Sequence, residues 1–245
     1  YDPNELVNEG VQHTEVTSGD ITWAFTSGTA ITDEKATFAA DLATFFTDSK
    51  ITLGNQINAL DTKTNSAGQT HTRFQPTVKA SAASDDNAIN IMVTLKEGYE
   101  FAPTKVSVNS SRWGTNGGSV NVTWINGDGS SLPIATGTCP ERSADESNGT
   151  SHAPYYTEIG KALNAKATTG TFGVKLNVYG IDNNKQISFN DLVVSGKLYQ
   201  ITGTGIRTLV TPTQGNNAYY TLQGTRVEQP QRGIYINNGR KVIVK

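Results

Sequence analysis

The chain has 245 residues, a net charge of −2 at pH 7 and 17% charged residues. This near-neutral charge argues against a nucleic-acid-binding surface, which requires clustered basic side chains. No apolar run approaches the roughly 18 residues of a membrane-spanning helix, so we expect no transmembrane segment. The single cysteine, Cys139, excludes an intramolecular disulfide and every cysteine-rich zinc site.

The N-terminal part of the sequence predicts one strand and one helix. Residues 1–19 are polar and lack periodicity, so we expect a lead-in strand or linker there. The stretch DITWAF, from Asp20, alternates polar and apolar side chains as a half-buried strand does. The stretch DEKATFAADLATFF, residues 33–46, places apolar side chains at spacings of three and four, which predicts a short helix. These side chains are Phe38, Leu42, Phe45 and Phe46.

Period-two alternation dominates the middle of the chain. It recurs at 89–95, 106–108, 120–124 and 172–178. Strands that are apolar on one side must bury that side against one another, and the 24 glycines are typical of a chain with many turns. The sequence therefore predicts an all-β fold, with a two-sheet sandwich over residues 20–198.

Two segments interrupt this pattern. The strand KQISFNDLVVSGKL, residues 185–198, breaks step at Asn190 and Asp191, which predicts a β-bulge. Residues 136–160 form the longest predicted loop, and a helical turn is expected to follow through Ile159, Ala162 and Leu163. Loops of this length in compact domains are often functional.

Two stretches carry a resemblance to a known class of domains. EGYEFAPTKVSVNSSRWGTNGG, from Glu97, and KQISFNDLVVSGKL together resemble the jelly-roll, galactose-binding-like modules of polysaccharide-degrading bacterial systems. The resemblance covers roughly Gly19 to Leu198. It implies a jelly-roll carbohydrate-binding module whose ligand is a polysaccharide or glycan. Such modules often hold a structural calcium ion, and on the resemblance alone Asp191 is the candidate ligand.

The predicted loops supply side chains suited to sugar binding. A pyranose offers C–H bonds on its face and hydroxyls around its rim, so a receptor needs a flat aromatic ring beside planar polar groups. The candidates are Arg112, Trp113, Asn116, Tyr155 and Tyr156. The alternative for Trp113 is a ring folded over the end of the sandwich, and one of the two adjacent tyrosines is expected to be structural.

Other residues are expected to be structural. Trp23 and Trp124 are in register with core-facing side chains, so both are predicted to be buried. The stretch from Asp182 to Asp191 is similar to a calcium loop but lacks its mid-loop glycine and terminal glutamate, so a hairpin turn explains it better.

The sequence contains no recognisable catalytic arrangement. Its neighbouring carboxylates, Asp85 with Asp86 and Asp145 with Glu146, are not the separated pair that glycoside hydrolysis uses. No Gly-x-Ser-x-Gly elbow is present. The protein is therefore not expected to be an enzyme.

The last residues differ in charge from the rest of the chain. Residues 220–245 carry five basic side chains against Glu228 alone. The segment YYTLQGTRVEQPQRGIYINNGRKVIVK resembles the C-terminal sorting domains of bacterial proteins exported to the cell surface. The matching positions are Leu222, Gly224, Arg226, Val227, Pro230, Gly233, Ile234, Tyr235, Gly239, Lys241 and Val242.

This resemblance implies a separate C-terminal domain, residues 199–245, that engages export machinery. Two hairpins are expected in it, VEQPQRGIY and INNGRK, the second around a tight Asn-Gly turn. The alternative is a terminal hairpin packed on the main domain, with lysines protecting its edge.

Taken together, the residues and resemblances predict non-catalytic carbohydrate binding by a secreted or cell-surface bacterial protein. Two alternatives stay open at this point. One is a surface adhesion or scaffold module with a protein partner, which predicts a contiguous apolar patch. The other is a polysaccharide-acting enzyme of unrecognised type, which predicts two convergent titratable groups in a cleft.

Overall fold

The computed structural model describes residues 12–64, 70–113, 118–143, 157–202, 218–228, 230–237 and 240–244. It divides the chain into two compact units, one comprising His13–Ile201 and one containing Thr202–Lys245. Each unit has its own sheets. No helix in the described part of the chain is long and apolar enough to cross a membrane.

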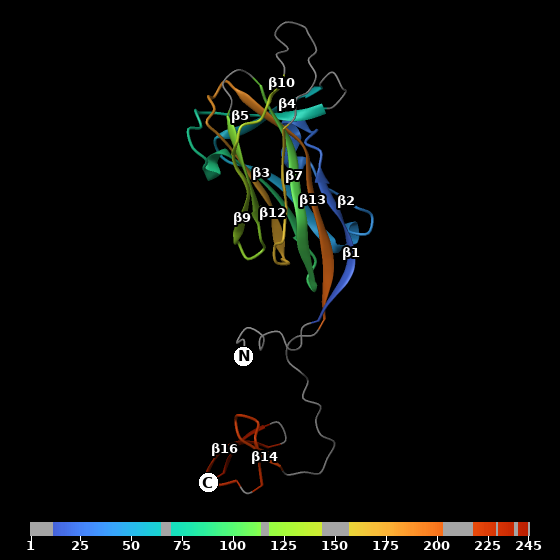
Figure 1. Cartoon of the computed structure of the whole chain (residues 1–245), viewed down its shortest axis with the longest axis vertical. Coiled ribbons are helices and arrows are strands. Elements are labelled where there is room, and N and C mark those ends of the chain that lie inside the picture. The colour runs from blue at the N-terminus through green and yellow to red at the C-terminus, as the bar shows by residue number, and fades with distance from the viewer. Residues whose placement is uncertain are drawn as a thin grey trace. The chain divides into compact units, whose positions relative to one another are not determined.

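The larger unit is a sandwich of two sheets (Figure 1). In the described residues, the first sheet has five strands in the order β3 (Phe46–Leu53), β6 (Ala88–Leu95), β12 (Thr171–Tyr179), β8 (Ser119–Ile125) and β9 (Ser131–Thr138). The second has eight strands, along the path β10 (Arg142–Ser143), β7 (Tyr99–Trp113), β13 (Gln186–Thr202), β1 (Gln12–Trp23) and β2 (Thr37–Phe38). Off this path, β11 (Thr157–Ala162) pairs with β7, β5 (Thr70–Pro76) pairs with β13, and β4 (Ile57–Thr64) pairs with β5.

Consecutive strands cross between the two sheets, as β6, β7 and β8 do, and nearly all pairings are antiparallel; β10 with β7 is parallel. The predicted all-β, jelly-roll-like sandwich is therefore confirmed. Three short 3₁₀ turns complete the unit: η2 (Gly28–Asp33), η3 (Ala43–Phe45) and η4 (Asp85–Asn87).

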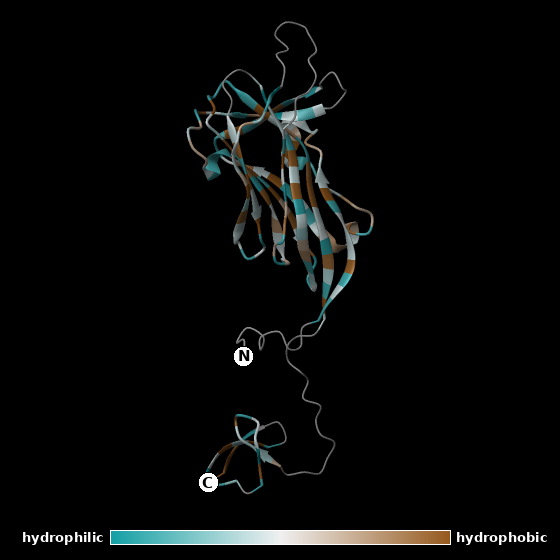
Figure 2. Cartoon of the chain, viewed as in Figure 1, coloured by the Kyte–Doolittle hydropathy of each residue, from teal (hydrophilic) through white to brown (hydrophobic). Residues whose placement is uncertain are grey.

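The core lies between the sheets and follows the predicted alternation, visible as alternating brown and teal along the strands in Figure 2. Phe101 of β7 stacks on Phe172 of β12, with ring centroids 5.5 Å apart, so it joins the two sheets. Trp23 and Trp124 are 1% and 0% exposed, which confirms their predicted burial. Burying such side chains is the main force that holds the sheets together.

The helix predicted over residues 33–46 is wrong. Phe38 lies in β2 and Phe46 begins β3, and their rings stack at 4.7 Å. Leu42, which lies between these two phenylalanines in the sequence, is fully buried. The segment also packs closely on Gly19 of β1, because a Cβ added at Gly19 would lie 2.7 Å from the Ala39 Cβ. Packing of this segment against β1 thus overrides a weak helical pattern.

Two further expectations are settled by the strand pairings. Residues 157–162 form strand β11, so the helical turn predicted at Ile159 is wrong. The bulge predicted at Asn190 and Asp191 is confirmed, because the register of β13 against β7 shifts between Asn190 and Val193. Asp191 has a φ of 47°, a left-handed conformation that is uncommon outside glycine.

The smaller unit is a four-stranded antiparallel sheet in the described residues. Its order is β15 (Arg226–Val227), β14 (Tyr219–Tyr220), β16 (Gly233–Asn237) and β17 (Arg240–Val244). The pairing of β16 with β17 agrees with the second predicted hairpin; its turn, Asn238 and Gly239, lies outside the described residues. The first predicted hairpin is wrong, because β15 pairs with β14 and not with β16.

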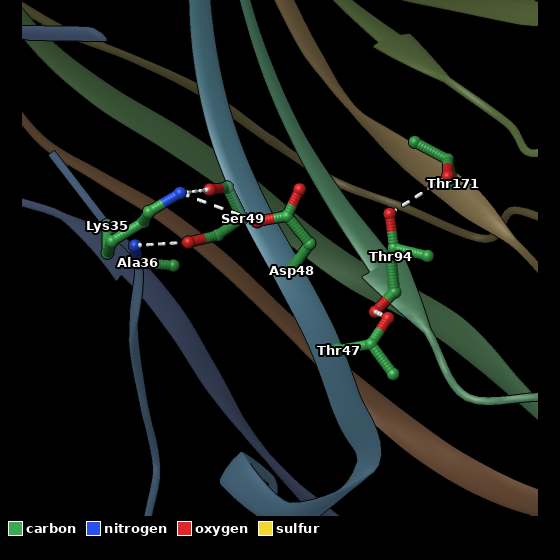
Figure 3. Close-up of polar contacts among 7 residues, drawn as sticks. All are labelled: Lys35, Ala36, Thr47, Asp48, Ser49, Thr94 and Thr171. Atoms are coloured by element: carbon green, nitrogen blue, oxygen red, sulfur yellow. Dashed lines mark hydrogen bonds and ion pairs between the residues drawn. The ribbon is translucent and has the colours of Figure 1, made fainter. Parts of the chain in front are cut away.

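A set of polar contacts ties the segment before β2 to β3, the edge of the other sheet (Figure 3). Ala36 donates its backbone N–H to Ser49 Oγ at 2.9 Å. Lys35 Nζ donates to the Ser49 carbonyl at 2.7 Å and lies 3.4 Å from Asp48 Oδ1. Because β2 pairs with β1 of the eight-stranded sheet, these bonds connect the two layers at their edges.

Substituting Ser49 tests this connection. Ser49→Ala leaves the Ala36 N–H without its acceptor at a position that is 6% exposed, so we expect the free energy of unfolding to fall by about 1–2 kcal/mol. Urea denaturation measures the change. Thr47→Ala is the matched control on the same strand, since the exposed Thr47 hydroxyl makes one long bond, 3.3 Å, to the Thr94 carbonyl. Equal losses in the two variants would contradict a tie at Ser49.

Candidate functional site

Strand alternation gives the eight-stranded sheet an outer face that is polar. In β13, Ile187 and Phe189 are fully buried in the core, so Gln186 and Ser188 point to the opposite side. Gln186 lies opposite Trp113 of β7, and Ser188 lies opposite Arg73 of β5. We name this side of the sheet the Trp113 face: Ser111 and Trp113 of β7, Gln186 and Ser188 of β13, and His71, Arg73 and Gln75 of β5. His71, Ser111 and Ser188 are fully buried, whereas the other four are half-buried and reach solvent. It lies at the end of the sandwich where β4, β5 and β10 are labelled in Figure 1.

Trp113 is held in a fixed orientation on this face. Its indole N–H donates to Ser188 Oγ at 2.9 Å, and Ser188 Oγ lies 2.8 Å from Ser111 Oγ. The ring is half-buried, with the His71 ring 5.3 Å away and the Arg73 guanidinium 6.0 Å from its centroid. Trp113 is thus neither a core residue nor a freely projecting one, and part of its ring stays open to solvent.

A chain of hydrogen bonds runs beside the ring. Arg73 Nη1 donates to Gln186 Oε1 at 2.7 Å, and Gln186 Nε2 donates to Gln75 Oε1 at 2.9 Å. Arg73 Nε also donates to the Asp61 carbonyl at 3.3 Å. Because arginine can only donate, this chain fixes which end of each amide is oxygen and which is nitrogen. The three planar groups form an ordered polar strip next to Trp113.

Of the other predicted ligand-binding residues, one points to the opposite side of the sheet and three lie outside the described residues. Arg112 precedes Trp113 in the same strand and lies opposite core-facing Ile187, so its side chain leaves the sheet on the other side. Arg112 Nε donates to the Pro140 carbonyl at 2.9 Å. Asn116, Tyr155 and Tyr156 lie outside the described residues, so their predicted roles stay predictions.

The described residues near Asp191 do not fit a calcium ion. Asp191 is exposed, and its Oδ2 accepts a bond of 3.1 Å from Asn190 Nδ2. Asn190 Oδ1 is buried without a hydrogen-bond partner, but one carboxylate and one amide oxygen fall short of the six to eight oxygens that calcium takes. No group of three or more His, Cys, Asp or Glu side chains gathers anywhere in the described part of the chain.

A carboxylate away from the face determines where β5 lies. Glu34 accepts the backbone N–H groups of Phe25, Thr26 and Ser27 at 2.6, 2.8 and 3.0 Å, and the Ser27 hydroxyl at 2.7 Å. Phe25, with a φ of 55°, then accepts the Thr72 N–H at 2.6 Å. Since Thr72 lies between His71 and Arg73, this contact holds the strand that carries half of the Trp113 face.

A separate hollow of about 420 Å³ lies beside the turn between β8 and β9, but its polar atoms are largely used within the turn. Asn126 Oδ1 accepts from Trp124 Nε1 at 2.6 Å, and Asp128 Oδ1 accepts the Ser130 N–H at 2.8 Å. Hydrogen bonds from the Ser130 side chain and backbone lower the pKa of Asp128. The residues lining this hollow include no aromatic ring, so it suits a sugar less well than the Trp113 face.

Sequence reasoning missed Arg73, Gln75 and Gln186. A usable signal was present in THTRFQP, residues 70–76, where the polar residues His71, Arg73 and Gln75 alternate with a second set of residues that includes Phe74. Such a strand has one polar face, but the pattern does not say which strand it pairs with.

Substituting Glu34 tests the anchoring of β5. Glu34→Gln keeps the shape of the side chain but places an amide N–H₂ against backbone donors, so we expect a loss of about 1.5–3 kcal/mol in unfolding free energy. Hydrogen exchange at the Thr72 amide should accelerate as well. Asp33→Asn, which neutralises the exposed neighbouring carboxylate, is the control and should leave both readings unchanged. Protection of Thr72 that is equal in both variants would contradict this role for Glu34.

No protein-family model matches the chain, and no curated protein matches it. Among solved structures, it is similar to the CBM22-1 xylan-binding domain of Paenibacillus barcinonensis Xyn10C, with 9% identity and a TM-score of 0.40 over 77% of this chain and 99% of that one. It is also similar to the CBM22-1–GH10 modules of Clostridium thermocellum Xyn10B complexed with xylohexaose, with 17% identity and a TM-score of 0.33 over 78% of this chain. A third similar structure is the enzymatically active domain of bacteriophage CBA120 tailspike protein 4, with 11% identity and a TM-score of 0.28 over 62% of this chain. The chain spans 29% and 19% of the length of the last two proteins.

Proposed function

We propose that the sandwich binds a polysaccharide or other glycan, without catalysis, on the Trp113 face. The observation that carries this proposal is the partly open indole of Trp113, fixed by its 2.9 Å bond to Ser188 beside the ordered amides of Gln186 and Gln75. The ring offers a surface for the C–H face of a pyranose, and the amides lie where they can bond its hydroxyls. Because the bonds among these groups are already formed, binding orders few side chains.

The protein-binding alternative is less well supported. It requires a contiguous apolar patch. In the described residues of the sandwich, the large apolar side chains that are exposed are Val16 and Val78, 41% and 47% exposed, and they come from β1 and from the segment after β5. Single exposed valines of this kind are ordinary on soluble domains.

The absence of catalysis is part of the proposal. Glycoside hydrolysis needs a pair of carboxylates across the scissile bond. The residues that define the Trp113 face are Trp, Arg, His, Gln and Ser, and none of them carries a carboxylate. These residues therefore lack the carboxylate pair that glycoside hydrolysis uses.

Substituting Trp113 tests the proposal. Trp113→Ala removes the stacking surface, so we expect at least about a tenfold loss of affinity, equivalent to about 1.4 kcal/mol. Trp113→Phe keeps a ring and should retain most of the binding. Isothermal titration against a panel that includes xylan, glucans, mannans and pectins measures both variants, and the melting temperature checks the fold. Unaltered affinity in a folded Trp113→Ala protein, or no heat from any glycan with the original chain, would overturn the proposal.

For the smaller unit, we propose the sorting role that its sequence resembles, and with it a secreted or cell-surface location in a bacterium. Strand register places Arg226, Tyr220, Ile236 and Lys241 in one row on one face of its sheet. Ile234 and Ile243, which are 43% and 71% exposed, are cross-strand partners on that face. An exposed apolar surface with basic neighbours is suited to contact with an export component.

Introducing one charge at two positions tests this role. In a bacterium that exports proteins with such tails, Ile243→Asp in the full chain should lower the fraction at the cell surface, because it places a charge beside Ile234 on the apolar face. Gln223→Asp adds the same charge in the exposed turn after β14 and should leave export unchanged. Surface protease accessibility measures both, and equal export of the two variants would count against the role.

A further inference from the structure

The positive charge of Arg73 is not neutralised within the described structure. Its printed contacts are to neutral groups: the Asp61 carbonyl, Gln186 Oε1 and the ring of Trp113. It forms no ion pair with any described carboxylate, and its side chain is half-buried. A partly desolvated cation without a counter-ion is costly, and the contact with the indole offsets only part of that cost.

The hydrogen-bonding groups around Arg73 are also unbalanced towards donors. Gln186 Oε1 accepts one bond from Arg73, and Gln75 Oε1 accepts one from Gln186, so each oxygen keeps one lone pair. The open donors outnumber these lone pairs: they are Gln75 Nε2, the second hydrogen of Gln186 Nε2, and the remaining hydrogens of the guanidinium, which has five in all. In the described residues, no other bond is made to Gln75 Nε2 or to Arg73 Nη2.

A ligand that satisfies such a site must bring acceptors and negative charge. A neutral sugar hydroxyl can accept from these donors, but it brings no charge to offset that of the guanidinium. A carboxylate only accepts, and it matches the planar fork of arginine. We infer that the Trp113 face recognises an acidic glycan, one whose sugars include uronic acids, with the carboxylate at Arg73 and the Gln75 and Gln186 amides, and a pyranose face on Trp113.

This inference rests on the proposed function, and it is tested with pairs of polymers that share a backbone. One pair is polygalacturonate and its methyl ester, and the other is glucuronoxylan and its carboxyl-reduced form. We expect the acidic member of a pair to bind at least about tenfold more tightly, with an affinity that falls as salt concentration rises. Isothermal titration measures all four, together with the neutral glycans of the panel described above.

The variants separate the role of the guanidinium from that of overall charge. Arg73→Gln should abolish the preference, so that the acidic and the neutral member of a pair bind this variant with similar affinity. Arg73→Lys should retain part of the preference, because a point charge replaces the fork. Lys50→Gln removes one exposed positive charge from β3 of the other sheet, and it should change nothing. Melting temperatures confirm that each variant is folded.

The outcomes distinguish this inference from the proposed function. Binding of neutral glycans with no preference for acidic ones overturns the inference alone, and the Trp113 face then remains a glycan site. A preference for acidic glycans that survives Arg73→Gln, or that falls equally in Lys50→Gln, also overturns it. If the original chain binds none of these glycans, both the inference and the proposed function are overturned.

Discussion

The arrangement of the Trp113 face depends on one carboxylate, that of Glu34. It accepts four hydrogen bonds from residues 25–27, and this holds Phe25 in a left-handed conformation with its carbonyl bonded to the Thr72 N–H. Thr72 lies in β5, so this bond reinforces the register that the pairings with β13 and β4 give the strand. A slip of one residue would turn Phe74 outward and bring Arg73 into the core, because side chains alternate along a strand. The Trp113 face therefore depends on the hydrogen bonds of Glu34, although Glu34 is not itself part of the face.

The core beneath the face and the face itself are built from the same strands. Phe25, Phe74 and Phe189 are fully buried and pack with ring centroids about 6 Å apart. Ser188 and Arg73 flank two of these rings in sequence and point the other way. Close packing leaves such rings few alternative positions, so the residues beside them are fixed as well. The close packing of the core therefore fixes the positions of the indole and the amides on the outer face.

How much the sequence predicted depends on how far apart the interacting residues are. Alternation in 89–95 and 172–178 was enough to identify β6 and β12, and a break in alternation identified the bulge at Asn190. Trp113 was chosen for its residue type, and Arg112, predicted beside it, points to the opposite face of the sheet, since neighbours in a strand do so. The side chains that contact its ring or its N–H, those of His71, Arg73 and Ser188, are 40 or more positions away, and the bond from Arg73 to Gln186 spans 113. No local pattern specifies such a pairing, and packing against β1 likewise overrode the helix expected at 33–46.

The charge of Arg73 is better explained by a ligand than by stability. An arginine retained for the fold alone usually has a carboxylate partner, or lies at the surface where water solvates it. Arg73 is half-buried, and its partners are a carbonyl, an amide oxygen and an indole. Natural proteins depart from fully satisfied interactions mainly at functional sites, where the missing partner arrives with the ligand. The same logic accounts for the amides, which Arg73 orients so that their open N–H groups outnumber the lone pairs left on their oxygens.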